Sequence, residues 1–150
     1  MIPGFSYRKK FSDLSEKEIL ALAISSEEDD ASIYRNYAEH LKKDYPDSSK
    51  IFLDMAKVED GHRKVLINKF QSRFGDNIPL IRREHVSGFY ARKPTWLIKN
   101  LSVDRIRLES EMMERDAYNF YMKAAQATTD AGTRKLLGDL AAAEAGHTSV

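Results

Sequence analysis

The sequence predicts an all-α protein, a four-helix bundle made of two helical hairpins that a long crossover joins. Two observations predict this class. Four long segments repeat apolar residues at steps of three and four, and one long stretch without such a repeat lies between the second and third segments. A bundle with one long crossover needs such a stretch. The chain has 150 residues, enough for one domain with a core, so we expect a single domain over 1–150.

The first hairpin is expected to consist of two helices with a short turn between them. Ser15 and Glu18 have the spacing of a capping box, and no Gly or Pro follows them before Pro46. The first helix should therefore span about residues 16–44, and the second about 49–73 after a turn that begins at Pro46. The apolar stripe of the first helix consists of Leu20, Ile24, Ala31, Tyr34, Ala38 and Leu41.

The crossover and the second hairpin follow. Residues 75–102 lack helical periodicity and include Gly75, so we expect them to form the crossover. Two further helices should span about residues 103–128 and 131–150, with a turn between them.

Polar residues occupy positions in these helices where apolar ones are expected, and they do so twice. The first and third helices each hold a Glu with a Tyr seven residues later, and the second and fourth each hold Glu-x-x-His within a longer repeated pattern. Three-residue spacing places Glu and His on one helical face. The duplicated positions are Glu27, Tyr34, Glu59, His62, Glu114, Tyr121, Glu144 and His147.

This pattern predicts a pair of bound metal ions. A buried carboxylate is costly unless a positive charge compensates it, and two divalent ions would neutralise four carboxylates. One Glu from each of two helices, together with Glu-x-x-His from each of the other two, is the ligand set of carboxylate-bridged di-iron or di-manganese bundles. We expect two iron ions, with manganese or zinc as substitutes. The predicted ligands are Glu27, Glu59, His62, Glu114, Glu144 and His147.

Some residues leave alternatives open. Glu111 lies one turn before Glu114 and is either an extra ligand or part of a solvated face. Tyr34 and Tyr121 are either plain core aromatics or donors of a hydrogen bond to a ligand carboxylate two turns away. A bundle whose polar residues only fix the helix register is a further alternative, although such devices are usually single residues.

The ligand pattern resembles that of the ferritin-like superfamily, and the rubrerythrin branch in particular. The stretches RFGDNIPLIRREHVSGF, RKPTWLI and RKLLGDLAAAEAGH further resemble the N-terminal ferritin-like domain of bacterial membrane-bound ferritins, the erythrin–vacuolar iron transporter proteins. The resemblance covers nearly the whole chain and implies a ferritin-like fold with the six predicted residues as di-iron ligands. In such proteins a membrane-embedded iron transporter follows this domain, and the whole is implicated in iron export and resistance to iron or peroxide stress.

The expected function is that of a di-iron protein that binds ferrous iron and reacts with dioxygen or hydrogen peroxide, as a rubrerythrin-like oxidase or peroxidase. The alternative is an iron-binding or iron-sensing module that serves an attached or partner membrane iron transporter. The chain contains no cysteine, so it cannot hold the cysteine-bound iron domain of rubrerythrins and would need an external electron donor.

Further expectations concern partners and location. The net charge of +1 gives no reason to expect nucleic acid as a partner. We expect a homodimer, with exchange of hairpins between subunits as an option. The fourth helix stops soon after its His, so we expect either a fragment of a longer protein, with the transporter domain as the candidate continuation, or a natural chain that a partner completes. The expected location is the cytoplasm, for a free protein or for the cytoplasmic domain of a membrane protein.

Overall fold

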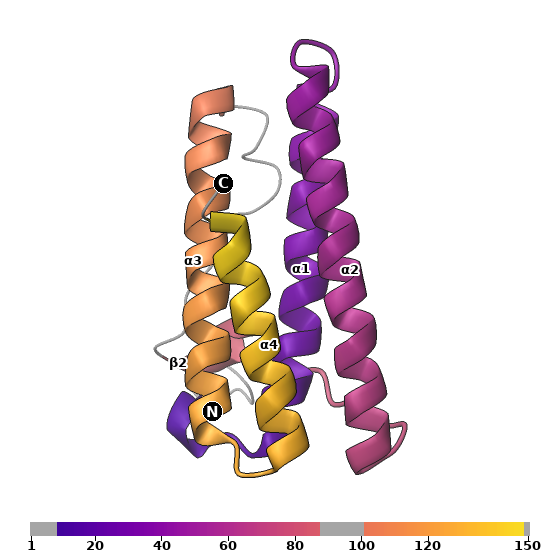
Figure 1. Cartoon of the computed structure of the whole chain (residues 1–150), viewed down its shortest axis with the longest axis vertical. Coiled ribbons are helices and arrows are strands. Elements are labelled where there is room, and N and C mark those ends of the chain that lie inside the picture. Colours follow the sequence, from indigo (N-terminus) through magenta and orange to yellow (C-terminus); the bar gives the residue numbers. More distant parts are fainter. Residues whose placement is uncertain (1–8, 88–100, 149–150) are drawn as a thin grey trace, which may run out of the picture.

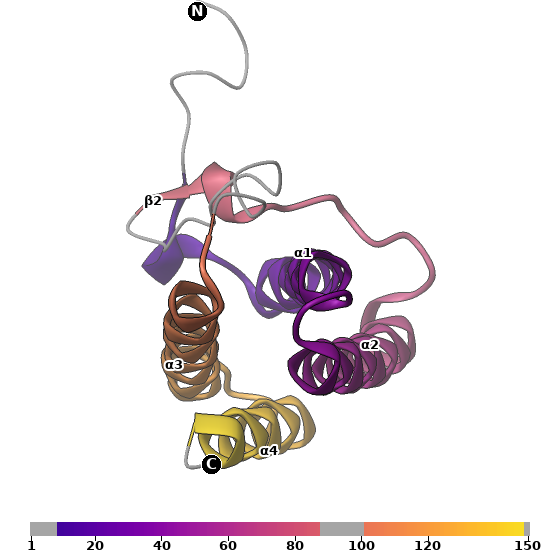
Figure 2. The same cartoon turned by 90° about the horizontal axis from the view of Figure 1, so that it is seen from above.

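The structure is a computed structural model, which describes residues 9–87 and 101–148, with side chains as far as residue 146. Four helices form two hairpins that lie side by side (Figure 1). Seen from the end, the helices stand at the corners of a bundle, and the segment that follows the second helix, as far as residue 87, passes over the outer side of the first helix (Figure 2). The predicted four-helix class is thereby confirmed. The helices are α1 (Glu16–Leu41), α2 (Pro46–Phe74), α3 (Val103–Ala127) and α4 (Ala131–Thr148).

The helix starts follow local capping chemistry. The predicted capping box at the start of α1 is present: the Ser15 hydroxyl accepts the backbone N–H of Glu18 at 3.2 Å, and the Glu18 carboxylate accepts that of Ser15 at 3.1 Å. At the start of α3, the Ser102 hydroxyl accepts the N–H of Arg105 at 3.1 Å. Both caps satisfy N–H groups that have no partner within the helix.

The boundary between the first two helices differs from the prediction. We expected the first helix to reach residue 44 and the second to begin at 49, whereas α1 ends at Leu41 and α2 begins at Pro46. Proline fits the first helical position because its missing N–H needs no partner there. Ser49 of α2 donates its hydroxyl to the Ala38 carbonyl of α1 at 2.6 Å and so links the two helices.

The crossover has structure that periodicity alone did not predict. It follows Gly75, whose φ of 89° lies in the left-handed region that favours glycine. It then forms the short helix η2 (Arg83–His85) and the strand β2 (Val86–Ser87). This strand pairs in parallel with β1 (Lys9–Lys10), which the short helix η1 (Phe11–Asp13) connects toward α1. Residues 88–100 of the expected crossover lie outside the described residues.

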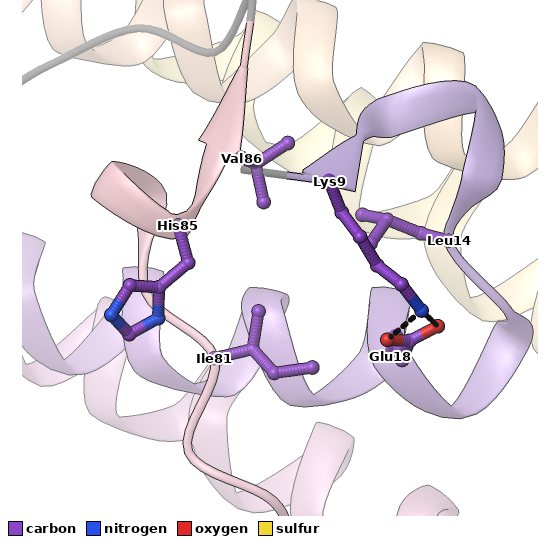
Figure 3. Close-up of a pocket in the computed structure, with 6 residues that line it drawn as sticks. All are labelled: Lys9, Leu14, Glu18, Ile81, His85 and Val86. Atoms are coloured by element: carbon purple, nitrogen blue, oxygen red, sulfur yellow. Dashed lines mark hydrogen bonds and ion pairs between the residues drawn. The ribbon is translucent and has the colours of Figure 1, made fainter. Parts of the chain in front are cut away.

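A pocket of about 170 Å³ lies where the crossover meets the start of α1 (Figure 3). Its charged lining residues Lys9 and Glu18 contact each other, with the Lys9 ammonium 3.0 and 2.8 Å from the two carboxylate oxygens. This ion pair joins β1 to the first turn of α1. The pocket is lined by Lys9, Leu14, Glu18, Ile81, His85 and Val86.

The core consists of two apolar clusters with polar residues between them. On α1, residues 19–24 belong to the first cluster and Ile33 to Leu41 contribute to the second. Glu27 lies between them on this helix. On α2, Phe52 and Ala56 belong to the second cluster and Leu66 and Phe70 to the first, so that Glu59 again falls between. The structure therefore buries a polar layer across the middle of an otherwise apolar core. Among the described helices, none has the length and apolar composition that a membrane span requires.

The cap of α1 gives a test of the fold. Replacing Ser15 with Ala removes the acceptor of the Glu18 N–H and should lower the free energy of unfolding by about 1 kcal/mol. The measurement is urea denaturation followed by circular dichroism. Ser72→Ala is the matched control, because the exposed Ser72 hydroxyl donates only to a carbonyl of its own helix. Equal effects of the two substitutions would contradict the assigned role of the cap.

Candidate metal centre

The polar layer brings together four side chains from three helices. Glu27 comes from α1, Glu59 and His62 from α2, and Glu144 from α4. Each offers one ligand atom, and these four atoms all lie within 4.8 Å of one another. Nδ1 of His62 lies 3.6 Å from Oε1 of Glu27 and 3.5 Å from Oε1 of Glu144. Two ligands that each lie about 2 Å from a metal ion are about 3–4 Å apart, so the spacing suits a bound cation.

Helical geometry explains how these residues meet. Glu59 and His62 are three residues apart and therefore share one face of α2. Glu27 occupies a seam position of α1, between the apolar residues Ile24 and Ala31, so the packing of α1 turns its carboxylate inward. The three glutamates are almost fully buried, whereas the His62 side chain is 14% exposed. His62 is the member of the group closest to solvent.

Two tyrosines link the carboxylates of the two hairpins. Tyr34 on α1 donates its hydroxyl to Oε1 of Glu114 on α3 at 2.5 Å. Tyr121 on α3 donates in the same way to Oε1 of Glu27 on α1. Of the two alternatives, the structure favours the hydrogen bond to a carboxylate of the predicted ligand set, but the acceptor lies on the facing helix rather than two turns away on the tyrosine's own helix. Seven residues correspond to a rise of about 10 Å along one helix, whereas the facing helix places a carboxylate oxygen at hydrogen-bond distance from each hydroxyl.

The remaining predicted residues are placed differently. Glu114 is buried on α3 at 3% exposure and holds the Tyr34 contact. His147 belongs to α4, but its side chain lies outside the described residues. Glu111 is exposed, and the structure does not bring it to the group, which favours the solvated-face alternative. Of the six predicted ligands, the structure thus gathers four and places Glu114 nearby.

Burial changes the protonation of the glutamates. It raises the pKa of Glu27 to about 8, and the charge of Glu144 adds to this effect, while a hydrogen bond with Glu59 opposes it. Burial also raises the pKa of Glu59 well above its ordinary range, helped by its hydrogen bond with Glu27 and the charges of its neighbours. In the metal-free protein, burial and the neighbouring charges therefore favour the protonated form of this carboxyl pair.

The tyrosines remain hydrogen-bond donors. Burial raises the pKa of both Tyr34 and Tyr121 well above the usual value, and the neighbouring carboxylates raise it further. A neutral phenol can donate its proton to a carboxylate oxygen. Each tyrosine therefore fixes one oxygen of a glutamate and leaves the other oxygen for a different partner.

Several buried polar atoms of the group lack a hydrogen-bond partner. Among the described residues these include Oε2 of Glu27, Oε1 of Glu59 and Nδ1 of His62. Buried polar atoms are nearly always satisfied in folded proteins, so such a concentration in one place needs a reason. A metal ion would accept electron pairs from all three atoms. Carboxylate oxygen and imidazole nitrogen, without thiolate, suit iron, manganese or zinc.

Sequence reasoning missed a buried ion pair close to this group. Arg83 of the crossover contacts Asp30, one turn after Glu27 on α1, and their closest atoms are 2.7 Å apart. Asp30 was open to detection, because it follows Glu27 by three residues and so lies on nearly the same face of the helix. Arg83 gave no such signal, since nothing local to the crossover shows which helix it contacts.

Comparison with known proteins agrees with this arrangement. A sequence model of the rubrerythrin family matches residues 18–150. A solved structure of a Pyrococcus furiosus protein described as hypothetical has a TM-score of 0.72 and 23% sequence identity. The similarity covers 93% of this chain and 87% of that one, and identity this low shows the fold alone. None of the curated proteins compared with the chain matches it.

The protonation of Glu27 makes the stability of the metal-free protein depend on pH. Its folded-state pKa of about 8 exceeds its ordinary value, so the folded protein binds a proton that the unfolded chain has lost between about pH 4.5 and pH 8. Stability should therefore fall as the pH rises through this window, by a few kcal/mol as an order of magnitude.

Urea unfolding in the presence of a chelator, repeated across this pH range, measures the effect. Glu27→Gln is the comparison, because glutamine does not titrate and is similar in shape. Its stability should depend less steeply on pH than that of the wild type. If the stability of the two proteins depended on pH with the same slope, Glu27 would have the same pKa in the folded and the unfolded state.

Proposed function

The chain belongs to the rubrerythrin family, and from this premise we propose that it is a di-iron carboxylate protein that binds ferrous iron and reacts with dioxygen or hydrogen peroxide. The observation that carries the proposal is the group of three buried glutamates and one partly buried histidine, Glu27, Glu59, Glu144 and His62, with ligand atoms within 4.8 Å of one another. The match to the family covers all these residues. Three buried carboxylates and an imidazole at such short spacing are hard to explain by packing alone.

Both hairpins would contribute ligands to the metal ions. Glu27 and His62 come from the two helices of one hairpin, and Glu59 and Glu144 bring a carboxylate from each hairpin. Glu114 and His147, which belong to the second hairpin, would be further ligands of the second ion. When bound, the iron pair supplies the electrons that reduce dioxygen or peroxide.

The surroundings support a reaction in a protected site. The polar layer lies between two apolar clusters, which limit the access of water. Tyr34 and Tyr121 each hold one carboxylate oxygen, so the glutamates are oriented before metal arrives. The raised pKa values of Glu27 and Glu59 mean that cation binding would release protons from this pair, because a metal ion binds the deprotonated carboxylate.

The absence of cysteine favours a second candidate function. A repeated oxidase or peroxidase cycle needs electrons, and without a cysteine-bound iron centre this chain depends on an external donor. A module that binds or senses iron on behalf of a membrane iron transporter needs no such supply. In that case the protein would bind ferrous iron with the same residues, and oxidant would not change the spectrum of the bound metal.

Anaerobic loading with ferrous iron separates the two candidates. We expect the protein to bind about two ions and to develop a ferric absorption band when dioxygen or hydrogen peroxide is added. Glu114→Gln should lose part of the bound iron and slow the change, whereas Glu111→Gln, on the exposed face of the same helix, should behave as the wild type. Bound iron without any spectral change would support the binding module, and no bound iron would refute both.

The tyrosine contacts predict a graded loss of metal affinity. Replacing Tyr34 or Tyr121 with Phe removes a hydrogen bond that orients a ligand carboxylate, and should weaken metal binding by about tenfold. Calorimetric titration with manganese, which avoids oxidation, gives the affinity. Tyr37→Phe is the matched control, because Tyr37 is buried on the same helix as Tyr34 and its hydroxyl donates to the Met113 sulfur at 3.9 Å. A similar loss in all three variants would indicate a general effect of losing a phenol.

A further inference from the structure

A buried ion pair fastens the crossover to α1 beside Glu27. Nη2 of Arg83 donates to Oδ1 of Asp30 at 2.7 Å and to the Ser26 carbonyl at 2.8 Å, and Nε donates to the Ser26 hydroxyl at 3.3 Å. Arg83 and Asp30 are each 4% exposed. One guanidinium therefore contacts α1 at residues before and after Glu27.

A second contact fastens the same turn. The Ser25 hydroxyl donates to the Ile81 carbonyl at 2.5 Å, so crossover residues 81–83 bind α1 over the turn that contains Glu27. These contacts lie on the side of α1 that the crossover covers (Figure 2). The turn is thus held from outside by the crossover, while Tyr121 holds the Glu27 carboxylate from inside the bundle.

Stability alone does not explain the pair. Replacing a buried ion pair with apolar residues of similar size is often neutral or stabilising, because each charge loses its hydration. Asp30 also adds a carboxylate close to the buried glutamates, where a further negative charge is energetically unfavourable. Arg83 compensates that charge. A polar pair at this place therefore suggests a geometric role.

The internal repeat provides a comparison within the chain. When Glu27 is aligned with Glu114, Ser26 aligns with Met113 and Asp30 with Ala117. The two positions on α3 are buried and apolar. The glutamate is duplicated, but the polar residues that receive Arg83 are not. Helix packing around such a glutamate therefore does not require them.

We propose that Arg83 is a positioning residue that makes the two halves of the metal centre unequal. By binding the turn around Glu27, it fixes the orientation of that glutamate before metal arrives, so the half with Glu27 and His62 binds its ion more tightly than the half with Glu114. This inference rests on the proposed function, because it requires the site to bind metal. Losing an outer contact that orients a ligand typically weakens metal binding by about 10–100-fold.

The test uses the full chain, freed of metal and titrated with cobalt(II), which reports binding by heat and by its absorption spectrum. The principal variant is Asp30→Ala with Arg83→Met, which copies the apolar pattern of the second half and leaves no unpaired buried charge. Arg83→Lys keeps the charge but cannot reproduce the paired contacts. Arg82→Met is the matched control, because Arg82 is 43% exposed at the side chain and lies 3.6 Å from Asp29.

The double variant should unfold as cooperatively as the wild type and bind one equivalent of cobalt about tenfold more weakly, with the other equivalent unchanged and an altered spectrum for the weakened ion. Arg83→Lys should fall between it and the wild type, and Arg82→Met should match the wild type. A merely structural role would lower the melting temperature without changing affinity or spectrum. Unchanged affinity in the double variant, or equal weakening of both equivalents, would overturn the inference alone. Failure of the wild type to bind cobalt would overturn the proposed function and the inference together.

Discussion

The burial of four glutamates in one layer of the bundle is the constraint on which the other features depend. Each is at most 3% exposed, and together they would place a concentrated negative charge in an apolar interior. Protons compensate part of this charge in the metal-free protein, as the raised pKa values of Glu27 and Glu59 indicate. Cations would compensate it in the metal-bound protein. Protons and metal ions would compete for the same oxygens, so the proposed metal binding would couple to folding and to pH.

The apolar clusters and two tyrosine hydrogen bonds fix the spacing of the helices around the polar layer. The apolar clusters on both sides pack the helices together, but the layer itself contains polar atoms without protein partners. The tyrosines span it in opposite directions, from α1 to α3 and from α3 to α1. Because each contact joins different hairpins, the spacing of the hairpins does not depend on a bound ion alone. Such preorganisation lowers the cost of ordering the ligands when metal binds.

The sequence predicts what depends on local pattern. The apolar stripes and the capping box of Ser15 predict the helices, and the duplicated Glu and Glu-x-x-His positions predict which residues face inward. Features that depend on tertiary contact were beyond it. The partner of Tyr34 is on a facing helix, and the contact of Arg83 with Asp30 joins residues 53 positions apart. The start of α2 was also missed, because proline is common both in turns and at the first position of a helix, and the sequence around Pro46 fits either role.

Topology explains why a duplicated ligand set need not give two equal halves. Two repeated hairpins are joined by only one crossover, which passes over α1 and pairs through β2 with β1 near the start of that helix (Figures 1 and 2). The turn around Glu27 therefore gains contacts, through Arg83 and Ile81, for which the aligned turn of α3 has apolar residues instead. A repeat can duplicate the residues that face inward, but it cannot duplicate the connection between its own copies. In a bundle of this topology, the asymmetry of the centre originates in the crossover.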